Sequence, residues 1–220
     1  MKPLLYLITD RQLLPQKKSN STLDHLIEFI AGAFAAGVDL AQIRERDLST
    51  RELFFLTERV ANLARNYQTQ VLVNDRADVA AACNVGVHLT TRSMPAQVVR
   101  QTFGDALLIG VSTHTLAEAR EAEAGGANFV VFGPVFDTPS KRAYGLPVGV
   151  SALQEVCKEV QIPVLALGGI KLENYEQTLQ AGAAGIAAIS LFTEAEDLFN
   201  LTGRIKGSGR LYERDDHSRV

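Results

Sequence analysis

Short apolar runs that alternate with amphipathic stretches restrict the fold of this 220-residue chain more than any other feature. The runs cover residues 4–9, 40–43, 71–73, 87–89, 107–111, 129–135, 164–167 and 186–189. Each is nearly continuous in apolar residues and short, which is typical of a strand buried on both faces. The alternation therefore predicts βαβ units built around a parallel sheet.

The stretches between the runs have the periodicity of helices. They include residues 49–66, 95–103, 115–124, 151–160 and 172–181. Strands interleaved with helices in this number favour an α/β fold, a closed (β/α)8 TIM barrel in one domain. A doubly wound open sheet is the alternative, although no G-x-G-x-x-G sequence follows the first run. We expect the barrel domain to span residues 1–202, and the polar residues 203–220 to form a tail that frays or packs loosely.

Composition and charge argue against several classes of protein. The net charge of −3 gives no reason to expect a nucleic-acid partner, and no apolar run reaches the ~18 residues of a membrane span. The N-terminal residues lack the cleavage pattern of a signal peptide. Cys83 and Cys157 stand alone in predicted helices and match no metal-ligand spacing, which favours packed thiols in a reducing cytoplasm. We expect a cytoplasmic protein without a nucleic-acid or membrane partner, and a homo-oligomer stays open.

Residues 132–141, with the sequence FGPVFDTPSK, change from a buried strand to a polar loop. The loop carries Thr138, Ser140 and Lys141. Hydroxyls, backbone N–H groups and one lysine beside a strand end are what a phosphate needs. The alternative is a surface turn with a solvated lysine, and the residues by themselves favour neither.

Long polar side chains end the second predicted strand. Alternation along a strand points Gln42, Arg44 and Arg46 to the same side. Placing these groups in a barrel mouth would be costly without an anionic partner, so they predict an anion site. A structural layer of ion pairs is the alternative.

Other strands also end in polar or glycine residues, at the end of a barrel where function is found. These residues are Asn74 and Asp75 after the third strand, Ser112 and His114 at the fifth, Gly168 and Gly169 after the seventh, and Ile189 and Ser190 at the eighth. A Gly-Gly pair before a helix lets backbone N–H groups approach a phosphate, and the residues ending the eighth strand would add donors to the same cup. A tight turn without a ligand is the alternative.

The histidines differ in setting. His25 and His217 are expected to face solvent, whereas His88 lies within an apolar run and is typical of a core histidine. His114 follows a strand end, where it would act as a general acid or base. The alternative is that His114 caps the helix that opens near Thr115, and the spacing alone does not decide.

Taken together, these residues resemble the thiamin phosphate synthase family, which also contains the thiazole tautomerases. The similarity extends over residues 4–192 and rests on motifs at barrel spacing. The motifs are YLITD (6–10), QIRER (42–46), NDR (74–76), GVHL (86–89), GVSTH (110–114), FGPVFDTPSK (132–141) and ALGGI (166–170).

The resemblance implies a synthase that joins two small phosphorylated substrates, hydroxymethylpyrimidine diphosphate and hydroxyethylthiazole phosphate. In this family the diphosphate leaves first and the thiazole nitrogen captures the pyrimidine cation, so the protein and Mg²⁺ stabilise the departing charge. By this likeness the diphosphate contacts are Gln42, Arg44, Asn74 and Lys141, with Ser112 nearby and Arg46 at a usual lysine position. The resemblance also implies that Asp75 binds Mg²⁺. It further implies that Thr138 and Ser140 form the thiazole-phosphate loop and that Gly169, Ile189 and Ser190 form the phosphate cup.

Two positions depart from the synthase pattern. Ser93 stands where a second Mg²⁺ carboxylate is expected, with the positive Arg92 beside it, and Arg46 replaces the lysine. Both departures resemble the tautomerase branch. The resemblance implies that a tautomerase moves a proton on a thiazole phosphate carboxylate without metal and uses a histidine at the position of His114.

We place the synthase first because most of the diphosphate-binding residues are retained. A tautomerase has little use for the metal carboxylate Asp75, unless Asp75 is structural and paired with Arg76 or Arg44. A non-catalytic thiazole-phosphate-binding regulator and an unrelated barrel that acts on a sugar phosphate are further alternatives.

Overall fold

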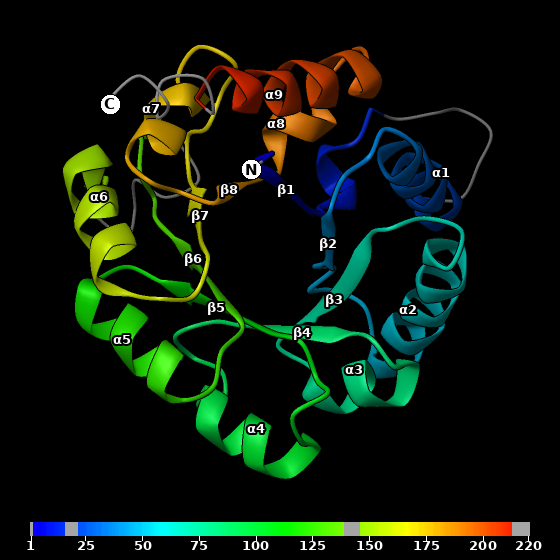
Figure 1. Ribbon diagram of the computed structural model, residues 1–220. Coiled ribbons are helices and arrows are strands. Elements are labelled where there is room, and N and C mark those ends of the chain that lie inside the picture. The colour runs from blue at the N-terminus through cyan, green and yellow to red at the C-terminus, as the bar shows by residue number, and fades with distance from the viewer. Residues whose placement is uncertain (1, 16–21, 139–145, 213–220) are drawn as a thin grey trace.

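The strands of this protein close into a parallel barrel in sequence order, as a computed structural model shows (Figure 1). The structure describes residues 2–15, 22–138 and 146–212. The strands are β1 (Leu4–Ile8), β2 (Leu40–Ile43), β3 (Gln70–Asn74), β4 (Gly86–Leu89), β5 (Ile109–Thr113), β6 (Phe129–Phe132), β7 (Val164–Leu167) and β8 (Gly185–Ala188). Pairing of β1 with β8, with Leu5 opposite Ile186, closes the circle and confirms the predicted (β/α)8 barrel.

Helices surround the strands on the outside of the barrel (Figure 1). They are η1 (Arg11–Leu13), α1 (Thr22–Ala35), α2 (Thr50–Ala64), α3 (Ala77–Cys83), α4 (Ala96–Phe103), α5 (Leu116–Ala124), α6 (Gly149–Glu159), α7 (Tyr175–Gln180), α8 (Ser190–Thr193) and α9 (Leu198–Tyr212). The capping box between Ser49 and Glu52 fixes the start of α2 close to the predicted position.

Two strands differ from the expected ranges in ways that matter for the site. β5 spans Ile109–Thr113 rather than residues 107–111, and because it ends two residues later, Ser112 lies inside the strand. β6 ends at Phe132 rather than at residue 135, because Pro134 has no N–H with which to continue the ladder. The chain after Pro134 still follows β7, and the N–H of Val135 donates to the carbonyl of Leu167 at 2.8 Å.

The core has an inner and an outer part. Inside the barrel, the aromatic rings of Tyr6 and Phe129 pack edge to face with centroids 5.6 Å apart. Gly110 makes room for this packing, since a Cβ at that position would lie 2.3 Å from the Phe129 ring. Outside, the strands are covered by the apolar faces of the helices, including Leu26 and Ile30 of α1.

The C-terminal part is more ordered than the sequence suggested. Helix α9 crosses the predicted boundary between residues 202 and 203, and Ile205 is fully buried. The ammonium of Lys206 donates to the carbonyl of Gly37 at 2.6 Å and to Asp39 at 2.8 Å. The expectation that the chain frays from residue 203 is therefore wrong for residues 203–207, because these contacts tie α9 to the amino end of β2.

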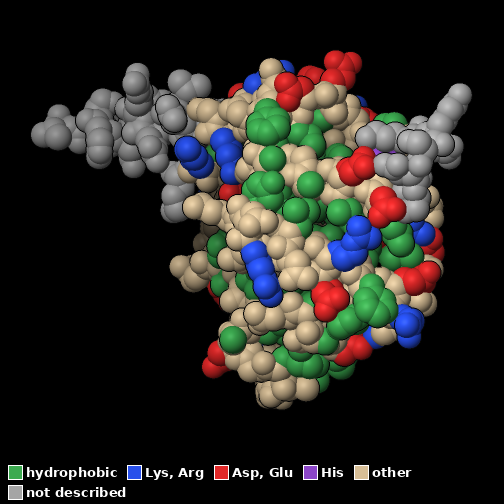
Figure 2. Space-filling view, turned by 90° about the vertical axis from the view of Figure 1, so that its right-hand side faces the viewer, with side chains coloured by type: hydrophobic (Ala, Val, Ile, Leu, Met, Phe, Trp, Pro, Cys, Tyr) green, Lys and Arg blue, Asp and Glu red, His purple; other side chains and the backbone are tan. Residues whose placement is uncertain are grey.

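Both cysteines lie in helices, as the sequence analysis predicted. Cys83 lies in α3 and Cys157 in α6, and burial raises the pKa of both thiols, that of Cys157 to about 11. On the face seen in Figure 2, acidic and basic side chains are interspersed without a patch of one sign. None of the described helices is long and apolar enough to cross a membrane.

Candidate active site

The carboxyl ends of the strands bring most of the predicted site residues to one end of the barrel, its mouth. The residues placed there are Arg44, Asn74, Asp75, Ser112, His114, Thr138, Gly169, Ile189 and Ser190. The loop after β6 is described only to Thr138, so Ser140 and Lys141 lie outside the described residues. His217 also lies outside them.

A chain of buried polar side chains runs through the barrel below the mouth. Gln42 Nε2 donates to the Tyr6 hydroxyl at 3.0 Å, and this hydroxyl lies 3.1 Å from Nδ1 of His88. The other ring nitrogen of His88, Nε2, lies 2.8 Å from the hydroxyl of Ser112. Gln42 is only 1% exposed, so it lies in the barrel interior below the mouth, and its amide donates to Tyr6 rather than facing the predicted anion site.

His88 is a core histidine, as expected, and it is uncharged. It is 2% exposed, and burial lowers its pKa to about 3, with a further contribution from the positive charge of Arg44. Sequence analysis gave no role to Tyr6, although a single tyrosine in an otherwise aliphatic inner strand is a signal that could have been used.

Arg44 is a partly desolvated cation at the mouth. Its side chain is 19% exposed, and its Nη1 lies 3.7 Å from a carboxylate oxygen of Asp10. Burial is the main cause of a lowered pKa, and the nearby charge of Arg46 adds to it. Arg46 itself is exposed. A guanidinium held in this way favours an anionic partner.

The structural ion-pair layer that sequence analysis weighed for Arg44 and Arg46 exists, but it is built on Glu45. Glu45 is 5% exposed and accepts from the Thr9 hydroxyl at 2.7 Å and from Arg11 Nη1 at 2.9 Å. Arg11 also binds Asp47 with two hydrogen bonds. The network joins the ends of β1 and β2, and the Thr9 oxygen also accepts from the backbone N–H of Arg44 at 3.0 Å.

Asp75 directly follows β3. Its φ of 64° is left-handed, a conformation that aspartate tolerates better than most side chains, and its N–H donates to the His88 carbonyl at 2.8 Å. Within the described ranges the Asp75 carboxylate has no ion-pair or hydrogen-bond partner. The possible partner Arg76 binds Asp78 and Thr50 instead.

Ser93 is used in a local turn. Its hydroxyl accepts from the N–H of Thr90 at 2.7 Å and lies 3.1 Å from the Thr90 hydroxyl. In the part of the chain that is described, no group of three or more His, Cys, Asp or Glu residues is placed to hold a metal ion. A single carboxylate such as that of Asp75 fits a Mg²⁺ ion that takes its remaining ligands from substrate phosphates and water.

Backbone N–H groups are available at the ends of β7 and β8. These strands are neighbours, with Leu167 opposite Ala187. Among the described residues, the N–H groups of Gly169, Ile170, Ile189, Ser190 and Leu191 have no hydrogen-bond partner. Unpaired N–H groups on adjacent strand ends can bind an anion.

Gly169 also has a packing role, as the alternative of a tight turn predicted. Its φ is 63°, and a Cβ there would lie 2.6 Å from the carbonyl oxygen of Asp137. The glycine therefore lets the loop after β6 approach the end of β7. A tight turn at Gly169 and a backbone N–H group that binds phosphate are compatible with each other.

His114 is half-buried beside the end of β6. Its Nδ1 bonds to the carbonyl oxygen of Gly133. A carbonyl only accepts, so Nδ1 carries a proton, and within the described residues Nε2 has no hydrogen-bond partner. Thr115, not His114, caps α5, because its side chain accepts from the N–H of Glu118.

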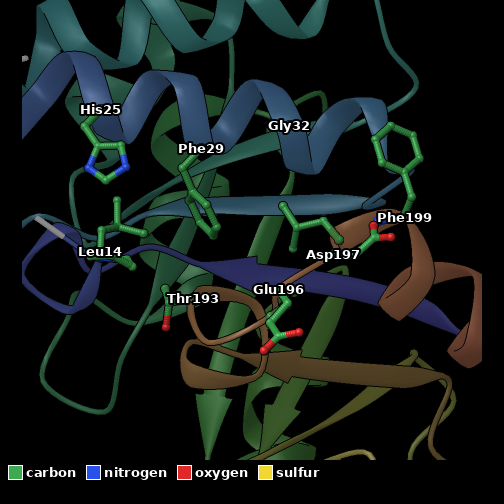
Figure 3. Close-up of a pocket in the computed structure, with 11 residues that line it drawn as sticks. Leu14, His25, Phe29, Gly32, Thr193, Glu196, Asp197 and Phe199 are labelled. Atoms are coloured by element: carbon green, nitrogen blue, oxygen red, sulfur yellow. The ribbon is translucent and has the colours of Figure 1, made fainter. Parts of the chain in front are cut away.

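A cavity of about 500 Å³ lies away from the mouth, between α1 and residues 193–199 (Figure 3). Its lining includes Phe29, Phe199 and Glu196. His25 is half-buried at this cavity, so the expectation that it faces solvent holds only in part.

The comparisons with known proteins agree with this geometry. The family model described as thiamine monophosphate synthase matches residues 5–192. The chain belongs to this family. The match covers the strands of the barrel from residue 5 onward and all the strand ends described above.

Individual relatives extend the comparison. The chain is 37% identical over 195 residues to the thiamine-phosphate synthase of Clostridium novyi, covering 88% of this chain and 92% of that protein. A Geobacter sulfurreducens protein, whose assignment to the same enzyme is itself provisional, is 46% identical over 187 residues and 84% of each chain. Among solved structures, thiamine phosphate pyrophosphorylase from Pyrococcus furiosus is 34% identical with a TM-score of 0.80, over 93% of this chain and 94% of that one.

Proposed function

We propose that this chain is a thiamine-phosphate synthase that joins hydroxymethylpyrimidine diphosphate to hydroxyethylthiazole phosphate. The family and the named activities of its relatives support this reaction. One observation carries the proposal further: the mouth has two separate groups suited to anions. The first is Arg44 after β2, with Asp75 after β3 as the carboxylate that would hold Mg²⁺, and the second is the set of N–H groups after β7 and β8 that have no partner among the described residues. In the closed ring, β1 separates β2 from β8, and β4 to β6 separate β3 from β7, so the two groups occupy separate places around the mouth, as two phosphorylated substrates require.

The proposed roles follow from charge and position. Arg44 and Asn74 hold the diphosphate above the buried Gln42, and Arg44 stabilises the negative charge that develops as the diphosphate leaves. Asp75 would bind Mg²⁺, which when present neutralises part of that charge. The N–H groups of Gly169, Ile189 and Ser190 hold the thiazole phosphate. By the family resemblance, Thr138, Ser140 and Lys141 close around the phosphates and Arg46 lies at the edge of the site.

The decisive experiment is turnover by the purified protein with both substrates, with and without Mg²⁺, following thiamin phosphate. We expect product that depends on the metal. Formation of thiamin phosphate without Mg²⁺ would remove the metal from the proposal. If no thiamin phosphate forms although thiazole phosphate still binds, the assignment as a synthase is wrong. Asp75→Asn should lower the response to Mg²⁺, whereas the matched surface variant Asp78→Asn should leave it unchanged.

Thiazole tautomerase is the second candidate, and Nε2 of His114, which has no hydrogen-bond partner within the described residues, favours it. The same histidine has no acid–base task in a dissociative synthase. A His114→Asn variant should therefore cost a tautomerase about 10²–10⁴-fold in rate and a synthase much less. Assaying the variant for both reactions separates the candidates.

We further propose a cytoplasmic enzyme, from the absence of disulfide-forming cysteine spacing in the sequence. Whether it forms a homo-oligomer is measured directly by light scattering of the purified protein.

A further inference from the structure

The chain from Gln42 through Tyr6 and His88 to Ser112 joins four strands, β2, β1, β4 and β5. Its first three members are at most 2% exposed, and only Ser112, near the end of β5, is half-buried. The Phe129 ring packs against both Tyr6 and His88, with centroids 5.6 and 6.3 Å away. This series of hydrogen-bonded side chains is therefore shielded from solvent inside the barrel, and Ser112 is its one member with partial exposure.

The hydrogen bonds in this series all run in one direction, from Gln42 as the first donor to Ser112 as the last acceptor. An amide nitrogen only donates, so the Tyr6 oxygen accepts from Gln42 Nε2 and its own proton is available for Nδ1 of His88. The neutral imidazole then carries its proton on Nε2 and donates to the Ser112 oxygen. As a result, the hydroxyl proton of Ser112 is left to point away from the chain, toward the mouth.

We propose that Tyr6 is a positioning residue: it holds His88 in the Nε2–H tautomer and so makes Ser112 a hydrogen-bond donor to an acceptor atom of the substrate. This inference rests on the proposed function for the nature of the substrate. The acceptor is a ring nitrogen of the pyrimidine or an oxygen of its diphosphate, and both have a lone pair that an O–H group recognises.

The tautomer can be measured without any assay of activity. In the full-length protein labelled with ¹⁵N-histidine, long-range proton–nitrogen correlation spectra report which ring nitrogen of His88 is protonated. A His88→Gln variant assigns the resonances by their loss. We expect a protonated Nε2 and an unprotonated Nδ1 in the wild type, and in Tyr6→Phe the growth of the other tautomer. A wild-type protein protonated on Nδ1, or an unchanged tautomer in Tyr6→Phe, would overturn the proposal.

Kinetics test whether Tyr6 acts through Ser112. We expect Tyr6→Phe to lower kcat/KM for thiamin phosphate formation by about five- to tenfold, the worth of one hydrogen bond. In a Ser112→Ala background the same change should have no further effect, whereas independent, additive losses would contradict the coupling. Tyr175→Phe, which removes a buried hydroxyl on α7, is the matched control and should retain wild-type turnover.

Binding of inorganic diphosphate identifies the acceptor. If Ser112 donates to the diphosphate, Ser112→Ala weakens binding of inorganic diphosphate; if it donates to the pyrimidine, that binding is unchanged and only turnover falls. Should the wild type form no thiamin phosphate, the proposed function fails, while the tautomer measurement still decides the order of the chain.

Discussion

The two ends of the barrel use the same kinds of side chain in opposite ways. At the amino end, the guanidinium of Arg100 donates to the carbonyls of Gly104, Leu107 and Gly126 at 2.7–2.9 Å. At the carboxyl end, the one partner of the Arg44 guanidinium within the described part of the chain is Asp10, in an ion pair of 3.7 Å. An arginine whose donors are used in the fold contributes stability, whereas one whose donors are left available is suited to a ligand.

Backbone groups show the same contrast. The carbonyl of Gly37, just before β2, accepts from Lys206, and the N–H of Leu5 donates to the Asp39 carboxylate at 2.8 Å. At the ends of β7 and β8, the N–H groups of Gly169 and Ser190 have no partner among the described residues. The comparison teaches that stability and function are separated along the barrel axis, and the following changes test it.

The largest effect is expected at the mouth. Arg44→Gln should lower kcat/KM by about 10²–10³-fold, because the charge that stabilises the departing diphosphate is lost. The free energy of unfolding should change little, since Arg44 makes few contacts of its own. Steady-state kinetics and urea unfolding measure the two quantities. Arg59→Gln, which removes an exposed ion pair with Asp24, is the control. Full activity of Arg44→Gln would show that the available guanidinium at the mouth has no role in turnover.

The amino end should respond in the opposite way. Arg100→Met should lower the free energy of unfolding by about 2–4 kcal/mol, because several carbonyls lose a charged donor at once. Turnover per folded molecule should stay at the wild-type value. Arg120→Met removes an exposed pair with Glu159 and should cost about 1 kcal/mol or less. Equal losses of stability in the two variants would contradict the structural role of Arg100.

His88, in the barrel interior between the two ends, should make the free energy of unfolding depend on pH. The folded protein holds His88 neutral with a pKa of about 3, against 6.5 for an ordinary histidine. The unfolded chain therefore binds more protons between these values, so this contribution is complete above about pH 6.5 and is lost as the pH falls toward 3. Urea unfolding across this range should show a steeper decrease for the wild type than for His88→Gln, and parallel decreases would refute it.

The smallest effect concerns α9. Lys206→Met should lower the free energy of unfolding by about 1 kcal/mol, because its bonds to Gly37 and Asp39 are partly exposed. Thermal unfolding measures the change. Arg204→Met, at an exposed position of the same helix, should be neutral, and equal shifts for both would show that the contacts of Lys206 contribute nothing.

Several features of the fold and site could be read from residues near one another in sequence. The apolar runs predicted the strands within a few residues, and β2 and β7 matched their expected ranges. The Gly168-Gly169 pair predicted either a phosphate contact or a tight turn, and both glycines have the positive φ values that such a turn requires. Hydrophobic periodicity and turn residues act locally, which is why they can be recognised before folding is considered.

Other features depend on residues that are distant in sequence. Glu45 joins Thr9 and Arg11 across two strands, and no local pattern distinguishes it from a solvated glutamate. The role of Tyr6 depends on Gln42, His88 and Ser112, which only closure of the barrel brings together. The expected loose tail was wrong for residues 203–207 for the same reason, because Lys206 finds its partners before β2.

The sequence by itself determined the (β/α)8 barrel and its family, because periodicity, strand-end motifs and their order are properties of the chain. It also determined which strand ends carry polar groups. Only the tertiary structure decided which of those groups are already bonded and which are available, as the contrast between Glu45 and Asp75 shows. The physical reason is that hydrogen bonding and desolvation depend on distances between strands, and these distances exist only in the folded barrel.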